Sequence, residues 1–196
     1  MAASQQLPRL RKLYQQTVAP QLMKRFGLRN VHQVPRPCRI VVNCGIGRFL
    51  ENQKLRPEVR DTVTDTLATI TGQKPIIIKA KKSVSNFKVR EGSPSAIMVS
   101  LRRDRMWHFL DRLINLTIPR IRDFRGLKVT SFDSCGNYSL GLVEQAVWPE
   151  INMAKVNFTH GMHINIVFEN STPQMSEFIL QEIGMPFVRR EEQTQS

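Results

Sequence analysis

The chain has 196 residues, 41% of them hydrophobic and 23% charged, which is ordinary for a globular protein long enough to bury a core. Its 29 Lys and Arg residues outnumber 16 Asp and Glu residues, and the net charge of +13 at pH 7 favours a polyanionic partner such as nucleic acid. No apolar run approaches the roughly 20 residues that span a bilayer, and three cysteines without CxxC spacing disfavour a disulfide framework and favour a reducing compartment.

The N-terminal region predicts a helix followed by a strand. Residues 7–26 carry apolar side chains at helical spacing and end before Gly27, a residue that stops helices. Pro20 lies inside this pattern, so we expect it to kink or split the helix. Residues 39–43 (RIVVN) predict a buried strand, and the glycines of the following CGIG permit a tight change of direction.

The middle of the chain predicts a helix followed by three short strands that are joined by turns. Residues 54–71 have helical spacing that ends at Gly72. Three short strands are expected after it, at 75–80, 86–91 and 95–102, joined by turns at Lys81–Ser85 and Glu91–Pro94.

The remaining third predicts two helices and two strands. An amphipathic helix covers 104–117 and ends before Pro119, and a basic irregular stretch follows it. Strands are expected at 136–143 and 162–169. The last helix is expected to start with a capping box from Ser171 to Gln174 and to end at Gly184.

These elements mix without regular βαβ alternation, which predicts an α+β fold: an antiparallel β-sheet with helices packed on one face, plus an N-terminal helical extension. No internal repeat or low-complexity segment divides the chain. We therefore expect one domain over residues 1–187, with its helix at 7–26 and its core at 37–187, and a polar tail at 188–196.

The charge is unevenly distributed. Residues 1–128 hold 26 basic and 8 acidic residues, a net charge of +18, whereas residues 129–196 hold 3 and 8, a net charge of −5. Three basic segments stand out: residues 79–90; Arg102, Arg103 and Arg105; and Arg120, Arg122, Arg125 and Lys128. A polyanion-binding region explains this better than a solvated basic face. Phe87 in the first segment either stacks on a base or belongs to the core, and both readings stay open.

Catalytic and metal-binding patterns are sparse. The stretch NCGIGR lacks a complete dinucleotide fingerprint, and no GK[ST] follows it. His160, His163 and upstream Cys135 do not have the spacing of a structural zinc site. We therefore expect that the protein is not an enzyme and that it binds no cofactor and no metal ion. The alternatives are an RNA-modifying or phosphoryl-transfer enzyme that uses the same basic surface, and a peripheral membrane protein whose residues 7–26 lie on lipid.

Five stretches go beyond composition: VPRPCRIVVNCGIG, TGQKPIIIKAKKSVSNFKVREGSP, RMWHFLDRLINLTIPRIRDFRGL, SFDSCGNYSLGLVEQ and WPEI. In this order and separation they resemble the bacterial-type ribosomal protein five of the large subunit, the uL5 family, from about Leu10 to Phe187. The resemblance implies a structural protein that binds 5S rRNA, or its organellar equivalent, in the central protuberance. It also implies contacts with large-subunit rRNA, peptidyl-site tRNA, neighbouring large-subunit proteins and a small-subunit head protein across an inter-subunit bridge, and none with a membrane.

The resemblance also implies site residues. The rRNA-binding positions that match the family are Asn43, Gln73, Lys74, Ser100 and Arg102, where short amides and hydroxyls suit 2′-hydroxyls and base edges. The tRNA-facing loop corresponds to Lys81, Lys82, Ser83, Val84, Ser85, Asn86, Phe87 and Lys88. Further basic RNA contacts are expected from Arg36, Lys79, Arg90, Arg120, Arg122 and Arg125.

The chain departs from the family pattern at three places. Ser134-Cys135 stands where relatives usually carry Gly-Arg, His160-Gly161-Met162-His163 replaces Arg-Gly-Met-Asp, and Ala96-Ile97-Met98 replaces Gly-Cys-Lys. Such drift suits the ribosome of an organelle, the mitochondrial matrix rather than the plastid, with the bacterial cytoplasm as the alternative.

Overall fold

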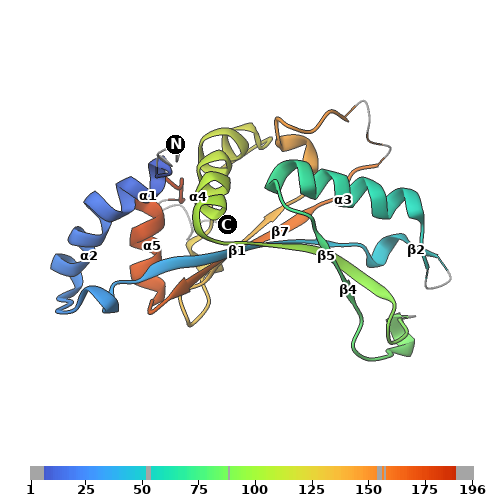
Figure 1. The fold of residues 1–196 in the computed structure, drawn as a ribbon, viewed down its shortest axis with the longest axis horizontal. Helices are drawn as coiled ribbons and strands as arrows, with labels where there is room; N and C mark the ends of the chain where they lie inside the picture. Colours follow the sequence, from blue (N-terminus) through green and yellow to red (C-terminus); the bar gives the residue numbers. More distant parts are fainter. Residues whose placement is uncertain (1–6, 52–53, 88, 154–155, 157, 189–196) are drawn as a thin grey trace, which may run out of the picture. The chain divides into compact units, whose positions relative to one another are not determined.

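The structure is a computed structural model that describes residues 7–51, 54–87, 89–153, 156 and 158–188. Its Cα positions group into two compact units. Unit 1 comprises Met1–Ile40, Arg102–Ser139 and Asn165–Ser196, and unit 2 comprises Val41–Leu101 and Leu140–Ile164. Helices and strands are mixed along the chain, so the predicted α+β fold is confirmed (Figure 1).

A five-stranded antiparallel sheet contributes residues to both units. Its strands in spatial order are β4 (Ile76–Lys79), β5 (Pro94–Leu101), β1 (Arg36–Gly45), β7 (Met162–Glu169) and β6 (Tyr138–Leu142). Two very short strands, β2 (Leu50–Glu51) and β3 (Lys54–Leu55), pair separately in unit 2. The strand predicted at 162–169 is therefore present with those bounds, and the strands predicted at 39–43, 75–80, 95–102 and 136–143 are present with shifted ends.

The N-terminal helix of unit 1 is split as Pro20 predicts. Helix α1 (Arg9–Leu13) passes through a π-helical turn at Tyr14–Val18 into α2 (Ala19–Phe26), which stops at Gly27 with a left-handed φ of 64°. Because proline lacks an N–H and its ring displaces a preceding carbonyl, a wider turn just before it relieves the clash. The helix predicted at 104–117 repeats this arrangement: α4 (Arg103–Arg112) continues into a π-helical turn at Leu113–Thr117, two residues before Pro119.

The N-terminal helix docks on the rest of unit 1 through its apolar side. Leu10, Tyr14, Val18 and Leu22 are buried, and the Tyr14 ring lies 5.6 Å from that of Trp107 on α4. Arg11 adds an ion pair to α4, with its Nη1 2.7 Å from Asp104 Oδ1. The apolar side of this helix is therefore a packing face within the protein.

The last helix, α5 (Pro173–Glu182), also belongs to unit 1, and the prediction of its N-cap was wrong by one residue. Thr172 caps it, because its hydroxyl oxygen accepts a hydrogen bond from the Met175 N–H at 3.4 Å. Pro173 occupies the first helical position, which makes the residue directly before it the cap. The Ser171 hydroxyl lies instead 2.6 Å from Ser176 Oγ.

Unit 2 is built on α3 (Pro57–Thr71), which packs on β5 and buries Val59, Val63, Leu67 and Ile70 (Figure 1). Each such side chain contributes roughly 1.5–3 kcal/mol when removed from water. The helix stops at Gly72, as predicted, with a φ of 65°. It begins at Pro57 and not at 54, because Lys54 and Leu55 pair with β2 and proline favours the first helical position.

The strand predicted at 86–91 does not form among the described residues of this segment, 86, 87 and 89–91, so this prediction was wrong. Strand β4 pairs directly with β5, with Ile76 opposite Met98 and Ile78 opposite Ala96. Between them, Ser85–Phe87 form a 3₁₀ turn, and Val84 and Val89 make a single bridge around it. Residues 86 and 87 lie in the turn itself, where the chain reverses, so they are unavailable for a strand ladder.

Candidate nucleic-acid interface

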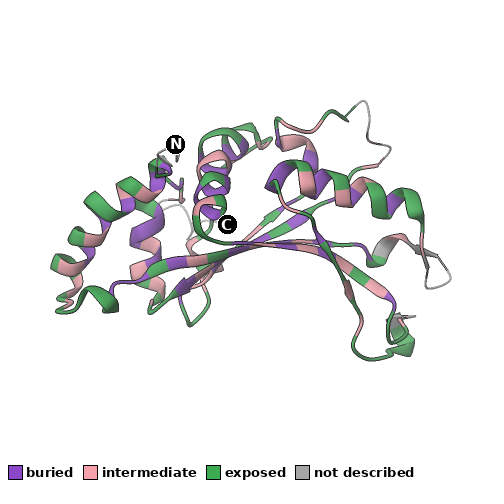
Figure 2. Ribbon diagram, viewed as in Figure 1, coloured by how far each residue is buried: buried purple, intermediate pink, exposed green. Residues whose placement is uncertain are grey.

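Helix α3 packs on one face of the sheet in unit 2, and within the described residues the other face is more accessible to solvent. Along β5, Ile97, Val99 and Leu101 are buried, while Ala96, Met98 and Ser100 alternate with them and are half-buried (Figure 2). This alternation is that of a strand with one face packed and the other accessible. We use the name open face for the accessible residues of unit 2 on β1, β4 and β5: Val41, Asn43, Ile76, Ile78, Ala96, Met98 and Ser100.

Gln73 and Ser100, two of the predicted rRNA-binding residues, are brought together at the edge of the open face. After the turn at Gly72, the Gln73 side chain donates from Nε2 to the Ser100 backbone oxygen at 3.3 Å. A carbonyl oxygen only accepts hydrogen bonds, so the amide must present its nitrogen to Ser100. This leaves Gln73 Oε1, which has no hydrogen-bond partner among the described residues.

Asn43 belongs to the same open face. It lies half-buried on β1, the strand next to β5 in the sheet. Within the described part of the chain, neither its side-chain amide nor the Ser100 hydroxyl makes a hydrogen bond. Together with Gln73 Oε1, these groups offer unfilled hydrogen-bonding capacity beside the apolar side chains of Val41 and Met98. That mixture suits an RNA surface, which presents sugar hydroxyls and base edges together.

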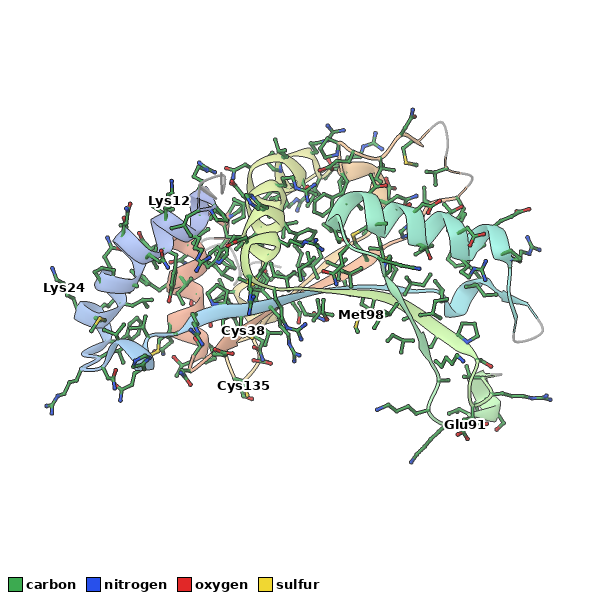
Figure 3. The ribbon with its side chains drawn as sticks, in the orientation of Figure 1. Lys12, Lys24, Cys38, Glu91, Met98 and Cys135 are labelled. Atoms are coloured by element: carbon green, nitrogen blue, oxygen red, sulfur yellow. The ribbon has the colours of Figure 1, made fainter. Side chains whose placement is uncertain are left out.

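A basic loop, defined as residues 80–93, connects β4 to β5. Lys81, Lys82 and Arg90 on it are exposed, as are Lys79 and Lys74 near the two ends of β4. Within the described residues, none of these five cations lies within 4.0 Å of a carboxylate. In Figure 3, side chains with nitrogen tips extend outward from the loop that carries the labelled Glu91.

The basic loop is braced by its own hydrogen bonds. Ala80 N–H donates to Ser93 O at 2.8 Å, Val84 N–H to Val89 O at 2.9 Å, and Glu91 N–H to the Ser83 hydroxyl at 2.9 Å. Its predicted contact residues Ser83, Val84, Ser85 and Asn86 are exposed. Phe87 is described only by its backbone in the 3₁₀ turn, and Lys88 lies outside the described residues, so both readings of the Phe87 side chain stay open.

The other predicted basic contacts belong to unit 1. Arg102, Arg120, Arg122 and Arg125 are exposed, with Arg102 directly before α4 and the other three after the turn that follows it. Arg36, at the start of β1, already has a partner, because its Nε lies 2.9 Å from Glu169 Oε2.

Cys38 and Cys44 on β1, and His160 just before β7, have shifted pKa values. Burial raises the pKa of the Cys44 thiol to about 12, and burial together with nearby Glu169 raises the pKa of Cys38, so both thiols stay protonated at neutral pH. His160 is buried, which lowers its pKa, whereas His163 is exposed. Among the described residues, no group of three His, Cys, Asp or Glu side chains is placed to hold a metal. No helix in the same residues is long and apolar enough to cross a membrane.

Sequence reasoning did not single out Thr71. This last residue of α3 is buried, and its hydroxyl oxygen accepts a hydrogen bond from the Gln73 N–H at 3.3 Å. The only signal was a hydroxyl side chain directly before the glycine that ends the helix. Such a residue commonly bonds nearby backbone groups, but its relation to Gln73 requires the turn geometry.

The fold and the site define an α+β protein in which unit 2 combines an accessible sheet face with a basic loop, and on this loop Lys81 and Lys82 have no carboxylate partner among the described residues. Residues 30–90 match the family model described as ribosomal protein L5, and residues 94–187 match the model described as the C-terminus of the same ribosomal family. Three curated relatives are each called large ribosomal subunit protein uL5. The relative from Synechocystis sp. is 47% identical over 91% of this chain and 97% of its own length. The one from Geotalea uraniireducens is 47% identical over 92% and 99%, and the one from Roseiflexus sp. is 49% identical over 92% and 98%.

The chain therefore belongs to the ribosomal protein L5 family, uL5, which comprises structural constituents of the ribosome and not enzymes. The resemblance stated from the sequence motifs is confirmed. The three relatives named above are bacterial.

Proposed function

We propose that this protein is a structural constituent of the large ribosomal subunit and that the open face binds 5S rRNA, or its organellar equivalent, in the central protuberance. The observation that carries the proposal is the set of polar side-chain atoms without a hydrogen-bond partner among the described residues, at Asn43 and Ser100 on the open face and at Gln73 on its edge. These are three of the positions that the family resemblance marks for rRNA. Lys74, also in unit 2, supplies positive charge, and Arg102, which follows β5 in unit 1, is proposed as a further rRNA contact.

RNA suits the open face better than a protein partner does. Five exposed cations in and around β4 and the basic loop have no carboxylate partner in the described part of the chain, so a polyanion would neutralise charge that the protein leaves unmatched. The short polar groups then set the register on the RNA, while lysines act as adaptable point charges.

The basic loop is the proposed contact with the elbow of peptidyl-site tRNA, through residues 81–88. Its internal hydrogen bonds support this role, because a loop that is already held in one conformation loses less conformational entropy on binding than a flexible loop does. Lys81 and Lys82 are exposed to solvent, so the hydrophobic core does not need them.

The remaining partners follow from the family. Large-subunit rRNA is the proposed partner of Arg120, Arg122 and Arg125, and of Arg36 if its ion pair with Glu169 exchanges for phosphate. Neighbouring large-subunit proteins and a small-subunit head protein complete the set. The substitutions at Ser134-Cys135 and His160-His163 alter positions proposed for the bridge contacts.

The ribosome of an organelle, mitochondrial before plastid, remains the proposed location, with the bacterial cytoplasm as the alternative. The support is the drift at residues 96–98, 134–135 and 160–163. Fractionation of source cells with an antibody to this protein tests it, and recovery only with bacterial-type cytoplasmic ribosomes would contradict the organellar assignment.

Crosslinking in intact ribosomes tests the function as a whole. Ribosomes are irradiated, the protein is isolated with its attached RNA, and the nucleotides bound to residues 72–102 are sequenced. We expect 5S rRNA, or its equivalent, from the open face and tRNA from the basic loop. A protein that stays at the top of a sucrose gradient while other large-subunit proteins sediment would refute the proposal, and RNA turnover by pure protein would revive the enzyme alternative.

A further inference from the structure

Gln73 is held at two points, and both are visible in the structure. Its side-chain Nε2 donates to the Ser100 carbonyl at 3.3 Å, and its backbone N–H donates to the Thr71 hydroxyl oxygen at 3.3 Å. The first contact ties Gln73 to β5 and the second ties it to the end of α3. A glutamine side chain free in water would populate many rotamers, so these contacts limit where its amide lies.

Thr71 is itself fixed in place. Its side chain is only 5% exposed, and its hydroxyl donates to the Leu67 carbonyl at 2.6 Å, one helical turn earlier. A hydroxyl has one proton and two lone pairs. With the proton directed at Leu67, the lone pairs remain to accept from Gln73. The buried hydroxyl thus links the last turn of α3 to the first residue after Gly72.

We infer that Thr71 is a positioning residue for rRNA recognition: its hydroxyl, with the Ser100 carbonyl, orients Gln73 so that Oε1 is presented to a hydrogen-bond donor on the RNA. This inference rests on the proposed function of Gln73. Thr71 is buried, so it acts through Gln73 and does not touch RNA. The donors available on RNA are ribose 2′-hydroxyls and base N–H groups, and phosphate oxygens are excluded because they only accept.

The test measures the affinity of the full-length protein for a bacterial 5S rRNA transcript, together with thermal unfolding. Thr71→Val removes the hydroxyl while keeping the shape, and we expect it to weaken binding about three- to tenfold, the effect of one lost hydrogen bond. Thr71→Ser restores the hydroxyl and should bind within about twofold of the unmodified protein. Thr66→Val is the matched control, a buried threonine on the same helix outside the contacts of Gln73, and it should leave affinity unchanged.

A double variant distinguishes a positioning role of Thr71 from a merely structural one. In the double variant Thr71→Val with Gln73→Ala, affinity should match that of Gln73→Ala alone, since Thr71 acts only through Gln73. Losses that multiply would overturn the inference. The inference would also be overturned if Thr71→Ser bound the transcript as weakly as Thr71→Val or Gln73→Ala. The comparison of Thr71→Ser with Gln73→Ala holds even if Thr71→Val does not fold.

Gln73→Glu tests the orientation of the amide. A carboxylate keeps acceptor oxygens but cannot donate to the Ser100 carbonyl, so we expect it to bind no better than Gln73→Ala. Binding at the unmodified level would show that the contact with Ser100 is dispensable and would overturn the inference. Failure of the proposed function looks different: Gln73→Ala then binds the transcript as tightly as the unmodified protein, or the unmodified protein does not bind it at all.

Discussion

Gln145 holds the backbone of His160 in unit 2. The Gln145 side chain is fully buried, and its Oε1 accepts a hydrogen bond from the His160 N–H at 2.6 Å. Its Nε2 donates to the Phe158 carbonyl at 2.8 Å. One amide therefore satisfies a backbone donor and a backbone acceptor two residues apart, and it fixes the return of the chain into β7.

Replacement of Gln145 by Leu should destabilise the protein by about 2–4 kcal/mol. The change leaves a buried N–H and a carbonyl without partners, and each such group costs about 1–3 kcal/mol. Urea unfolding followed by circular dichroism measures the difference. Gln174→Leu, at an exposed position on α5, is the control and should change stability by less than about 0.5 kcal/mol. Equal stability of the two variants would show that the Gln145 contacts are not needed.

Stability should fall as the pH is lowered from about 7.5 to about 5.0. Burial places the pKa of His160 below its ordinary value of 6.5 in the folded protein. The unfolded chain then binds more protons than the folded one below about pH 6.5, so acid favours unfolding, and the stability is fully present only above that pH.

His160→Phe keeps a ring beside Phe158, whose ring centroid lies 5.9 Å from that of His160, and removes the titration. Its unfolding temperature should therefore change less between the two pH values than that of the unmodified protein. His163→Phe, at an exposed position on β7, serves as the control and should keep the full pH dependence. The same pH dependence in His160→Phe would assign the effect to another group.

Gly136→Ala should destabilise unit 1 strongly, whereas Gly45→Ala should not destabilise unit 2 to the same degree. Gly136 has a φ of 78°, and an added Cβ would lie 2.9 Å from the Thr172 carbonyl oxygen, a backbone atom that cannot swing away. Gly45 has ordinary backbone angles and nothing within 4 Å of an added Cβ. Left-handed strain alone costs about 1–2 kcal/mol, and the clash adds to it. Thermal unfolding of the two variants measures the contrast, and a smaller loss for Gly136→Ala than for Gly45→Ala would contradict it.

The double change Lys81→Glu with Lys82→Glu should impair tRNA binding at the peptidyl site and leave folding intact. Both lysines are exposed and lie outside the core, so we expect stability to change by less than about 0.5 kcal/mol. Binding of tRNA to subunits assembled with the variant gives the functional measurement. Lys12→Glu with Lys24→Glu makes the same charge change at exposed positions of the N-terminal helix (labelled in Figure 3) and is the control. If both pairs of substitutions impaired tRNA binding equally, the effect would depend on the net charge of the protein and not on the position of Lys81 and Lys82.

The affinity of the isolated protein for 5S rRNA should fall steeply with salt. Each phosphate that a lysine or arginine neutralises releases counterions, and the logarithm of affinity falls by roughly 0.7–0.9 per phosphate for each tenfold rise in salt. Filter binding between about 50 and 300 mM KCl gives the slope. Lys74→Gln should lower the slope by the contribution of about one phosphate, whereas Asn43→Ala should weaken binding and leave the slope unchanged. A flat salt response would contradict phosphate contacts.

Local chemistry made much of the fold predictable. The helix ends at Gly27 and Gly72 follow from glycine's freedom to adopt positive φ, and the split before Pro20 follows from its missing N–H. The alternation along β5 and β1 is a property of strands with one packed face, so the sheet could be anticipated from the order of residues. The ordered motifs also predicted the family, and the excess of basic residues in the first two-thirds predicted a polyanionic partner.

Contacts between distant residues could not be read in the same way. Gln73 meets the Ser100 carbonyl 27 positions later because β5 pairs with β4, and Arg36 meets Glu169 across 133 positions because β7 lies beside β1. The strand wrongly expected at 86–91 failed for the same reason: β4 pairs directly with β5, and that pairing decides which residues of the loop remain for a turn. Residue order by itself determined most of the helices and strands and predicted a polyanionic partner, since both depend on the residues that follow one another along the chain. Only the tertiary structure decided which polar atoms are satisfied and which have no partner among the described residues, because hydrogen bonding depends on distances in space.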